Sequence, residues 1–167
     1  MVKTVFYILI WGLFLIGNTC AKSREISPQF QARLVKVYLS SMKIDLDRFT
    51  LAIISKDIQK SLRLKNALTK KSHFKINNKA IDFSIVLLDE VSPDKQIDAY
   101  FFYDNYQKVQ DKLSFVQSSK LVGDGATIGF ELKKTVPKIY INIKSLKSLG
   151  IIYPLDLLRF ATIMGDK

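Results

Sequence analysis

The sequence has one histidine and one cysteine, and its serines and carboxylates form no recognised catalytic motif. Gly123-Asp124-Gly125 has the composition of a phosphate-binding loop. A dinucleotide-binding loop, however, needs a third glycine and a following helix, whereas a strand pattern follows here. We therefore interpret this tripeptide as a chain corner that needs a positive φ angle. Ser118 and Ser119 lie outside any Gly-x-Ser-x-Gly motif, which would mark a nucleophilic serine.

The histidine and the carboxylates do not indicate a metal site or an acid–base pair either. His73, the single histidine, stands beside Lys71 and Ser72, whereas a zinc site takes several His, Cys or carboxylate ligands. The carboxylates of the central region are irregularly spaced, and we expect them at solvated strand ends: Asp82, Asp89, Glu90, Asp94 and Asp98. The sequence thus predicts no catalytic residue, no metal ligand and no cofactor site. A hydrolase with paired carboxylates stays open as a weaker alternative.

The clearest structural signal lies in the last third of the chain. Two stretches of alternating hydrophobicity flank a short break at Lys134–Pro137. This period of two predicts a β-hairpin with one buried face. The residues of that face are Ile128, Phe130 and Leu132 in the first strand, and Ile139, Ile141 and Ile143 in the second. A short helix at Ser145–Leu149, ended by Gly150, and a helix starting at Pro154 with Leu155, Leu158 and Thr162 on one stripe are expected to follow.

The preceding part of the chain alternates between helix and strand patterns. Ser27 and Pro28 start an amphipathic helix, Pro28–Met42, with Phe30, Leu34, Val37 and Ser41 on one stripe. The apolar run Phe49–Ser55 predicts a strand buried on both faces. Asp57 then caps a helix over Ile58–Lys70, in which Ile58, Leu62 and Leu68 are apolar.

Further strands are predicted at Ala80–Leu88, at Ile97–Tyr103, whose aromatics Tyr100 to Tyr103 pack the core, and within Leu113–Val122, with a short helix at Tyr106–Lys112. This order of elements is typical of an α/β protein. We predict a single domain, residues 22–167, with a mostly parallel sheet flanked by helices and a C-terminal β-hairpin.

The same elements carry a family resemblance. The chain has a glycine corner at Gly125, a strand with Ile128 and Phe130, an Ile141-Asn142 strand end, a Gly150-Ile151 step and a final Leu157-Leu158 pair. This order resembles the C-terminal part of the YfiR/HmsC-like family of small exported bacterial proteins. The resemblance covers about the last third of the chain well, and the rest only by order of elements. It implies a periplasmic repressor that binds the periplasmic part of an inner-membrane diguanylate cyclase.

The first 21 residues have the three-part pattern of a secretory signal peptide. Lys3 precedes an apolar run of 12 residues, Val5–Ile16, and small and polar residues lead to a cleavage site after Ala21. The run is shorter than the roughly 20 residues that span a bilayer. An uncleaved membrane anchor and a lipid anchor at Cys20 are the second and third interpretations. Cleavage removes the single cysteine, so the mature chain can form no disulfide.

The charge balance predicts the class of partner. The chain has 26 Lys and Arg against 15 Asp and Glu, and loss of Lys3 leaves 25 against 15, a net charge of +10. Because an exported protein does not meet genomic nucleic acid, we expect this charge to face anionic lipid, polysaccharide or an acidic protein. The predicted helix Ile58–Lys70 and its end are rich in candidates: Lys60, Arg63, Lys65, Lys70 and Lys71. A solvated helix face is the simpler explanation of that cluster.

Two functions from different classes follow. The first is a non-enzymatic exported regulator that binds the periplasmic domain of a membrane signalling protein. The second is a periplasmic small-solute-binding or sensor domain with a pocket at the carboxyl ends of the strands, where open α/β sheets bind ligands. A flat apolar patch favours the first, and a pocket lined by polar groups favours the second. A homodimer is compatible with both.

Overall fold

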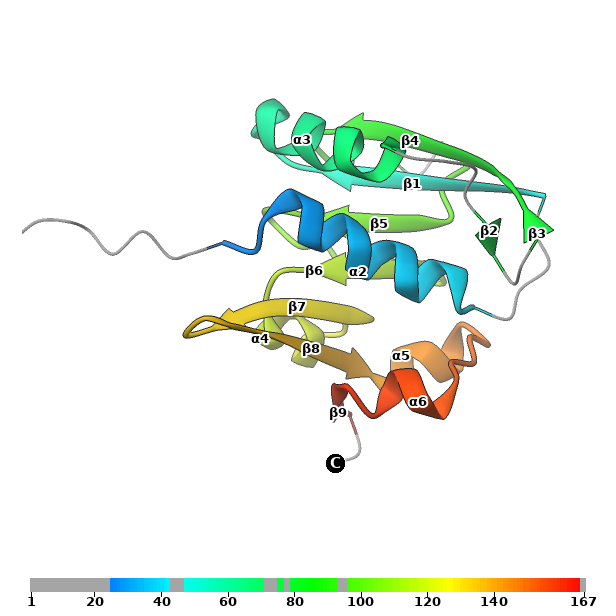
Figure 1. Ribbon diagram of the computed structural model, residues 1–167, viewed down its shortest axis with the longest axis vertical. Helices are drawn as coiled ribbons and strands as arrows, with labels where there is room; N and C mark the ends of the chain where they lie inside the picture. Colours follow the sequence, from blue (N-terminus) through cyan, green and yellow to red (C-terminus); the bar gives the residue numbers. More distant parts are fainter. Residues whose placement is uncertain (1–24, 43–46, 71–74, 77–78, 93–95, 166–167) are drawn as a thin grey trace, which may run out of the picture.

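A computed structural model describes residues 25–42, 47–70, 75–76, 79–92 and 96–165. The predicted signal peptide, Cys20, His73, Lys71 and Asp94 lie outside these residues. The main sheet has seven strands in the order β4-β1-β5-β6-β7-β8-β9 (Figure 1). In chain order they are β1 Arg48–Ile54, β4 Asp82–Leu88, β5 Ala99–Phe102, β6 Leu113–Val116, β7 Ile128–Lys133, β8 Val136–Asn142 and β9 Ala161–Met164. Strands β2 Lys75–Ile76 and β3 Lys79–Ala80 form a separate antiparallel pair.

Most neighbouring strands of the sheet run parallel. β1 pairs in parallel with β4 and β5, and the parallel arrangement continues through β6 to β7. β8 then returns antiparallel to β7, with Phe130 opposite Ile139, and β9 pairs in parallel with β8. The prediction of a single α/β domain with a mostly parallel sheet and a C-terminal hairpin is therefore confirmed.

Two long helices cover one face of the sheet (Figure 1). They are α2 Pro28–Ser40 and α3 Ile58–Thr69. Both begin at the predicted caps, because the Ser27 side chain accepts a hydrogen bond from the N–H of Phe30 and that of Asp57 accepts from Gln59 and Lys60.

The buried stripes of these helices differ from the predicted ones. In α2 the buried residues include Gln31, Val35 and Tyr38, while Phe30 and Val37 are exposed. In α3, Leu68 is buried but Ile58 and Leu62 are exposed. The apolar pattern predicted that Phe30, Val37, Ile58 and Leu62 are buried. The buried residues lie instead on the neighbouring stripe of each helix, which includes the polar residues Gln31 and Ser61.

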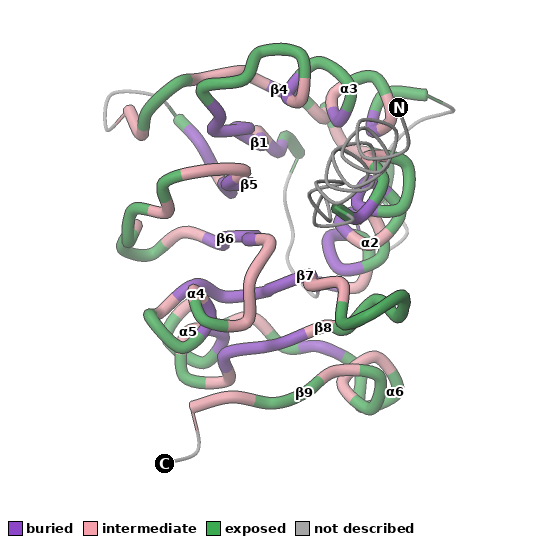
Figure 2. The backbone as a smooth tube through the Cα atoms, turned by 90° about the vertical axis from the view of Figure 1, so that its left-hand side faces the viewer, coloured by how far each residue is buried: buried purple, intermediate pink, exposed green. Residues whose placement is uncertain are grey.

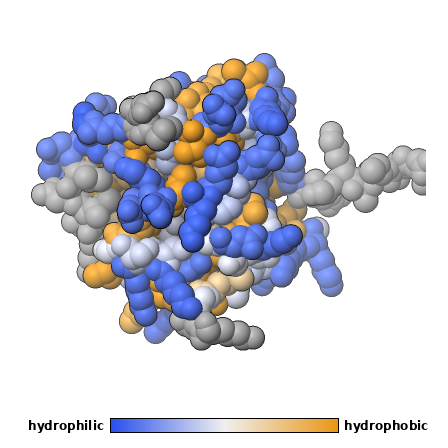
Figure 3. All heavy atoms as spheres, turned by 180° about the vertical axis from the view of Figure 1, so that it is seen from behind, coloured by the Kyte–Doolittle hydropathy of each residue, from blue (hydrophilic) through white to orange (hydrophobic). Residues whose placement is uncertain are grey.

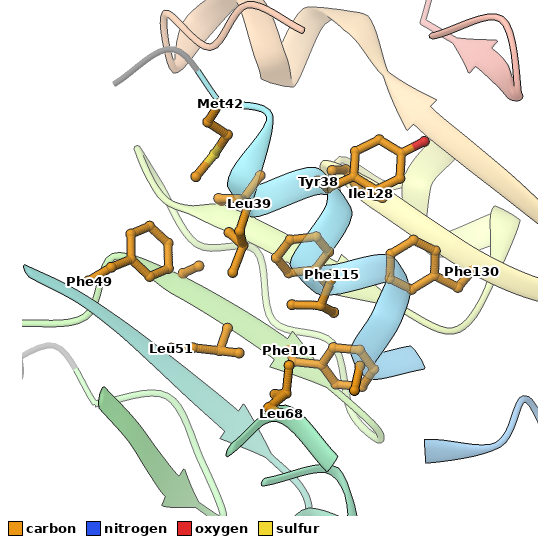
Figure 4. Close-up of a cluster of buried hydrophobic side chains, with 14 of the residues drawn as sticks. Tyr38, Leu39, Met42, Phe49, Leu51, Leu68, Phe101, Phe115, Ile128 and Phe130 are labelled. Carbon is orange, nitrogen blue, oxygen red and sulfur yellow. The ribbon is translucent and has the colours of Figure 1, made fainter. Parts of the chain in front are cut away.

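A row of aromatic rings from three strands forms the centre of the core under α2 (Figure 4). Phe101 of β5, Phe115 of β6 and Phe130 of β7 are stacked, with ring centroids 6.5 Å apart in the first pair and 5.9 Å apart in the second. Tyr38 of α2 packs on Phe130 with a centroid distance of 6.1 Å. Large aromatic side chains at these distances contribute both buried area and favourable ring contacts. This row fixes α2 across the middle of the sheet.

The opposite face has a thinner cover. Helix α4, Ser119–Gly123, and the connection after β5 lie against it, so Val122, Tyr106 and Val109 pack on a smaller apolar cluster. A methyl group on Gly129 would come within 2.5 Å of Val122 Cγ2, so the glycine permits α4 to lie close to β7. Tyr140 is buried on this face too. The hairpin is thus covered on both faces near its base, and the prediction of one buried face is wrong there.

Three predicted elements are different in the structure. Residues 106–109 have no regular structure and form no helix. Leu113–Val122 holds the strand β6 and also α4, since Ser118 caps a helix there. The last predicted helix is only α6, Leu155–Leu158, and Thr162 lies in β9, because the β8 edge offers hydrogen-bond partners to Ala161–Met164. Helix α5 is Ile143–Ser148, so Ile143 is helical, and Gly150 has the expected positive φ of 65°.

The core position of Phe130 gives a direct test of the hairpin register. Phe130→Ala should lower the free energy of unfolding by about 3–5 kcal/mol, because it removes a fully buried ring from the aromatic row. Lys133→Ala should have a far smaller effect, since the Lys133 ammonium lies in solvent, 5.3 Å from the centroid of the Tyr140 ring. Urea titration measures both. Similar losses in the two variants would mean that the register of β7 is shifted by one residue.

Candidate functional site

The order of the parallel strands defines where a ligand of such a sheet is expected. Counted along the chain, the five parallel strands are ordered 2-1-3-4-5, so the chain leaves β1 toward β4 on one side and reaches β5 on the other. In open α/β sheets, ligands bind outside the carboxyl ends of the strands at this switch point. Figure 2 looks onto that edge. Ser55 follows β1 there, and Tyr103 and Asp104 follow β5.

Hydrogen bonds join the ends of β1 and β5 directly. The Ser55 hydroxyl donates to Asp104 Oδ2 over 2.9 Å, and the N–H of Asp57 donates to Ser55 Oγ over 3.0 Å. The N–H of Tyr103 donates to the carbonyl of Ile54. Ser55 is thus held between two strands and the start of α3.

A salt bridge lies beside this link. Lys60 Nζ is 2.9 Å from Glu25 Oε1. The hydrogen bond to Glu25 raises the pKa of Lys60, and the charges of Asp104 and Asp57 add to this effect. Both partners are substantially exposed, so the pair contributes little to stability. Its role is to connect the residue that precedes α2 with the first turn of α3.

Three polar side chains join α2 to the ends of β5 and β6, and we call Gln31, Tyr103 and Gln117 the polar link. Tyr103 Oη donates to Gln31 Oε1 over 2.7 Å, and Gln31 Nε2 donates to Gln117 Oε1 over 3.0 Å. Gln31 is 1% exposed. Burial, and to a smaller extent the charge of Glu25, raise the pKa of Tyr103, so the phenol stays protonated and donates. These hydrogen bonds satisfy the side chains of Gln31 and Tyr103 beyond the ends of β5 and β6.

A small cavity lies at the carboxyl ends of β1 and β4. It has a volume of about 330 Å³ and is lined by Ser55, Lys56, Ile58, Ser61, Leu87, Leu88 and Asp89. The lining combines apolar walls with hydroxyls and both signs of charge. The hydroxyl of Ser61 is buried and has no hydrogen-bond partner among the described residues. A small polar molecule would find complementary groups there.

The most exposed apolar side chains lie at the opposite end of the sheet. We call Ile152, Leu155, Phe160 and Ile163, together with β9, the C-terminal edge. Phe160 is 79% exposed and Leu155 74%. β9 is an edge strand, and no charged residue or proline stands between Phe160 and Gly165. In Figure 2, β7 and β8 have buried stretches and β9 has none. Figure 3 shows hydrophobic side chains at the lower margin, where this end lies. Natural edge strands usually carry charges or proline to prevent pairing, so this edge is open to a partner.

The residues singled out in the sequence do not converge on one site. Gly125 has a φ of 113°, which confirms the corner. Ser118 caps α4, and the N–H of Ser119 donates to Glu131. Asp98 accepts from the N–H of Thr50 over 2.7 Å at the amino end of the strands. Asp82 begins β4, and Asp89 and Glu90 follow the end of that strand. All three are exposed. Of the Tyr100 to Tyr103 aromatics, the first three are buried, as predicted, and Tyr103 is half-buried.

No local pattern in the sequence predicted the polar link of Gln31, Tyr103 and Gln117. Gln31 bonds to Tyr103 and Gln117, which are 72 and 86 positions away. Within the described part of the chain, no group of three or more His, Cys, Asp or Glu is placed to hold a metal ion. The described helices include none that is long and apolar enough to cross a membrane. The basic residues Lys60, Arg63 and Lys65 are on α3, and Lys70 caps its end.

Comparisons with known proteins define the class of fold. No protein-family model matches the sequence, and no curated protein matches it. Two solved structures are similar in fold: an ABC domain in complex with L-Trp from Streptococcus pneumonia, and a conserved domain protein from Vibrio cholerae O1 biovar El Tor. Both have a TM-score of 0.55, with sequence identities of 13% and 12%. They cover 83% and 84% of this chain, which spans only 62% and 61% of theirs. These likenesses show the fold alone: the protein is an α/β domain with a mostly parallel sheet.

The hydrogen bonds of the polar link can be tested by removing single hydroxyl groups. Tyr103→Phe should lower the free energy of unfolding by about 1–3 kcal/mol, because it leaves buried Gln31 Oε1 without its donor. Tyr38→Phe is the matched control, since the buried Tyr38 hydroxyl has no partner among the described residues and burial raises its pKa to about 12. This control should cost little or nothing. Urea titration of both variants checks the pair, and a greater loss in Tyr38→Phe would contradict the assigned contacts.

Proposed function

We propose that the protein is an exported regulator that acts by binding another protein, the periplasmic part of a membrane signalling protein of the diguanylate-cyclase type. One observation carries the binding role: the C-terminal edge exposes large apolar side chains beside an edge strand of the sheet. The resemblance to the YfiR/HmsC-like family supports the kind of partner. The signal-peptide pattern of residues 1–21 supports export to the periplasm.

The C-terminal edge provides the chemistry for such binding. The outer side of β9 has backbone N–H and C=O groups available for strand addition, the mode by which an extended segment joins a sheet. Exposed Phe160 and Leu155 supply apolar anchors beside it. A few well-packed anchor residues usually contribute most of the binding energy in protein interfaces. The regulator then works by population shift, and a preference of about 2.7 kcal/mol for the inactive form of the partner is a hundredfold in affinity.

A second candidate function rests on the cavity beside β1. Its volume of about 330 Å³ and its mixed lining suit a small polar solute. A solved structure of similar fold contains L-Trp. A solute-binding or sensor role is therefore the alternative to protein binding. The two functions differ in the surface that they require, because the cavity lies near β4 and the C-terminal edge lies at the opposite end of the sheet.

Complementation of a deletion strain tests the regulator role. Deletion of the gene should raise cyclic-di-GMP and surface attachment, and the wild-type gene should restore them. Phe160→Asp should fail to restore them, because loss of a central apolar anchor costs about 2 kcal/mol or more, roughly thirtyfold in affinity. Val136→Asp is the matched control: Val136 is also exposed, at 54%, but lies at the start of β8, before the residues Ile139–Asn142 that pair with β9, so this variant should complement.

Immunoblots and N-terminal sequencing of the periplasmic fraction establish that each variant is exported and present in equal amount. Unchanged cyclic-di-GMP on deletion would overturn the regulator role. Raised cyclic-di-GMP with full complementation by Phe160→Asp would keep the regulator role but remove the C-terminal edge from it. Tight binding of a small solute, lost on Ser61→Leu, would favour the sensor function.

A further inference from the structure

The outer face of the two long helices is unusual in its side chains. We call Phe30, Arg33 and Val37 of α2 and Ile58, Leu62 and Arg63 of α3 the helical face. All six are exposed, Ile58 by 62% and Leu62 by 37%. The two helices lie next to each other on the same side of the sheet (Figure 1). A surface helix normally turns a polar face to solvent, so four exposed apolar side chains on one pair of helices call for a partner.

The charge of these helices has a single sign. α2 and α3 contain Arg33, Lys36, Lys60, Arg63 and Lys65 and no acidic residue. Lys60 is bound to Glu25, which precedes α2. The other four basic side chains pair with no carboxylate among the described residues. The helical face is therefore both apolar and uniformly positive, and its complement is a surface that is apolar below an anionic layer.

We propose that the helical face binds the surface of an anionic phospholipid bilayer. The exposed apolar side chains reach the boundary between headgroups and acyl chains, while the arginines bind lipid phosphates, as in amphipathic helices that lie in the membrane interface. Guanidinium groups suit phosphate oxygens because they donate two hydrogen bonds at once.

Two features favour lipid over an acidic protein. The exposed apolar side chains are spread over two helices, and a fluid bilayer accepts such a surface without a matching shape. In addition, the apolar run Val5–Ile16 comes before α2 in the sequence, so the chain is expected to meet a membrane during export. Lipid binding here goes beyond the proposed regulator function, because it uses a different surface from the C-terminal edge.

Vesicle sedimentation tests the proposal. The protein is isolated from cells, its N-terminus is determined by mass spectrometry, and it is mixed with vesicles of phosphatidylglycerol and phosphatidylcholine or of phosphatidylcholine alone. The wild-type protein should bind the first and not the second, and more weakly as salt is raised, because screening shortens the reach of the charges. Arg33→Gln with Arg63→Gln should weaken binding about thirtyfold, since each basic residue near an anionic surface contributes about fivefold.

The controls separate the helical face from overall charge. Lys108→Gln with Lys147→Gln removes the same charge from exposed positions away from α2 and α3, and should change binding by less than about twofold. Ile58→Asn with Leu62→Asn should reduce the binding that remains at high salt. Circular dichroism confirms that each variant is folded; these side chains are exposed, so folding should be retained.

Three results would overturn the proposal. The first is the absence of binding to phosphatidylglycerol vesicles at low salt. The second is an equal loss in the Lys108 and Lys147 control, which would indicate a non-specific charge effect. The third is retention on immobilised polyglutamate without retention by vesicles, which would assign the helical face to an acidic protein. None of these results depends on the outcome of the complementation test, so the two proposals fail independently.

Discussion

The structure depends on the stacking of Phe101, Phe115 and Phe130 across three neighbouring strands. These rings form a continuous apolar row, and Tyr38 places α2 on it. Because α2 comes before β1 in the chain but packs on β5, β6 and β7, this long-range contact closes the domain. It also brings Gln31, on the same helix, over the carboxyl ends of the strands. The core packing thus places Gln31 within hydrogen-bond reach of Tyr103 and Gln117.

The functional proposals follow from that closure. Gln31, Tyr103 and Gln117 are bonded to one another, so a solute that displaced Gln31 would leave buried polar groups unsatisfied. The surfaces proposed for binding lie at the periphery, on the C-terminal edge and on the outer side of α2 and α3. The first offers a free strand edge with apolar anchors, and the second combines apolar side chains with one sign of charge. The cavity beside β1 is the exception that keeps a sensor role as the alternative.

The sequence predicted the elements whose signals are local. Ser27 and Asp57 mark their helices by capping, the run Phe49–Ser55 marks β1, and strict alternation marks the hairpin of β7 and β8. Prediction failed where a distant partner decides the structure. Ala161–Met164 forms a strand because it pairs with the edge of β8. Gln31 is buried instead of Phe30, because Tyr103 and Gln117 form hydrogen bonds with its side-chain amide. Those partners lie far away in the sequence, so no local pattern could indicate the polar link.

Amide hydrogen exchange of the protein, alone and in native membranes that contain the proposed signalling partner, tests the central claim most directly. Binding through the C-terminal edge predicts new protection of the backbone N–H groups of β9, with no change at Ser55 to Asp57 or at Tyr103 and Asp104. Protection of the carboxyl edge, with β9 unchanged, would contradict the claim and place the functional site at the switch point.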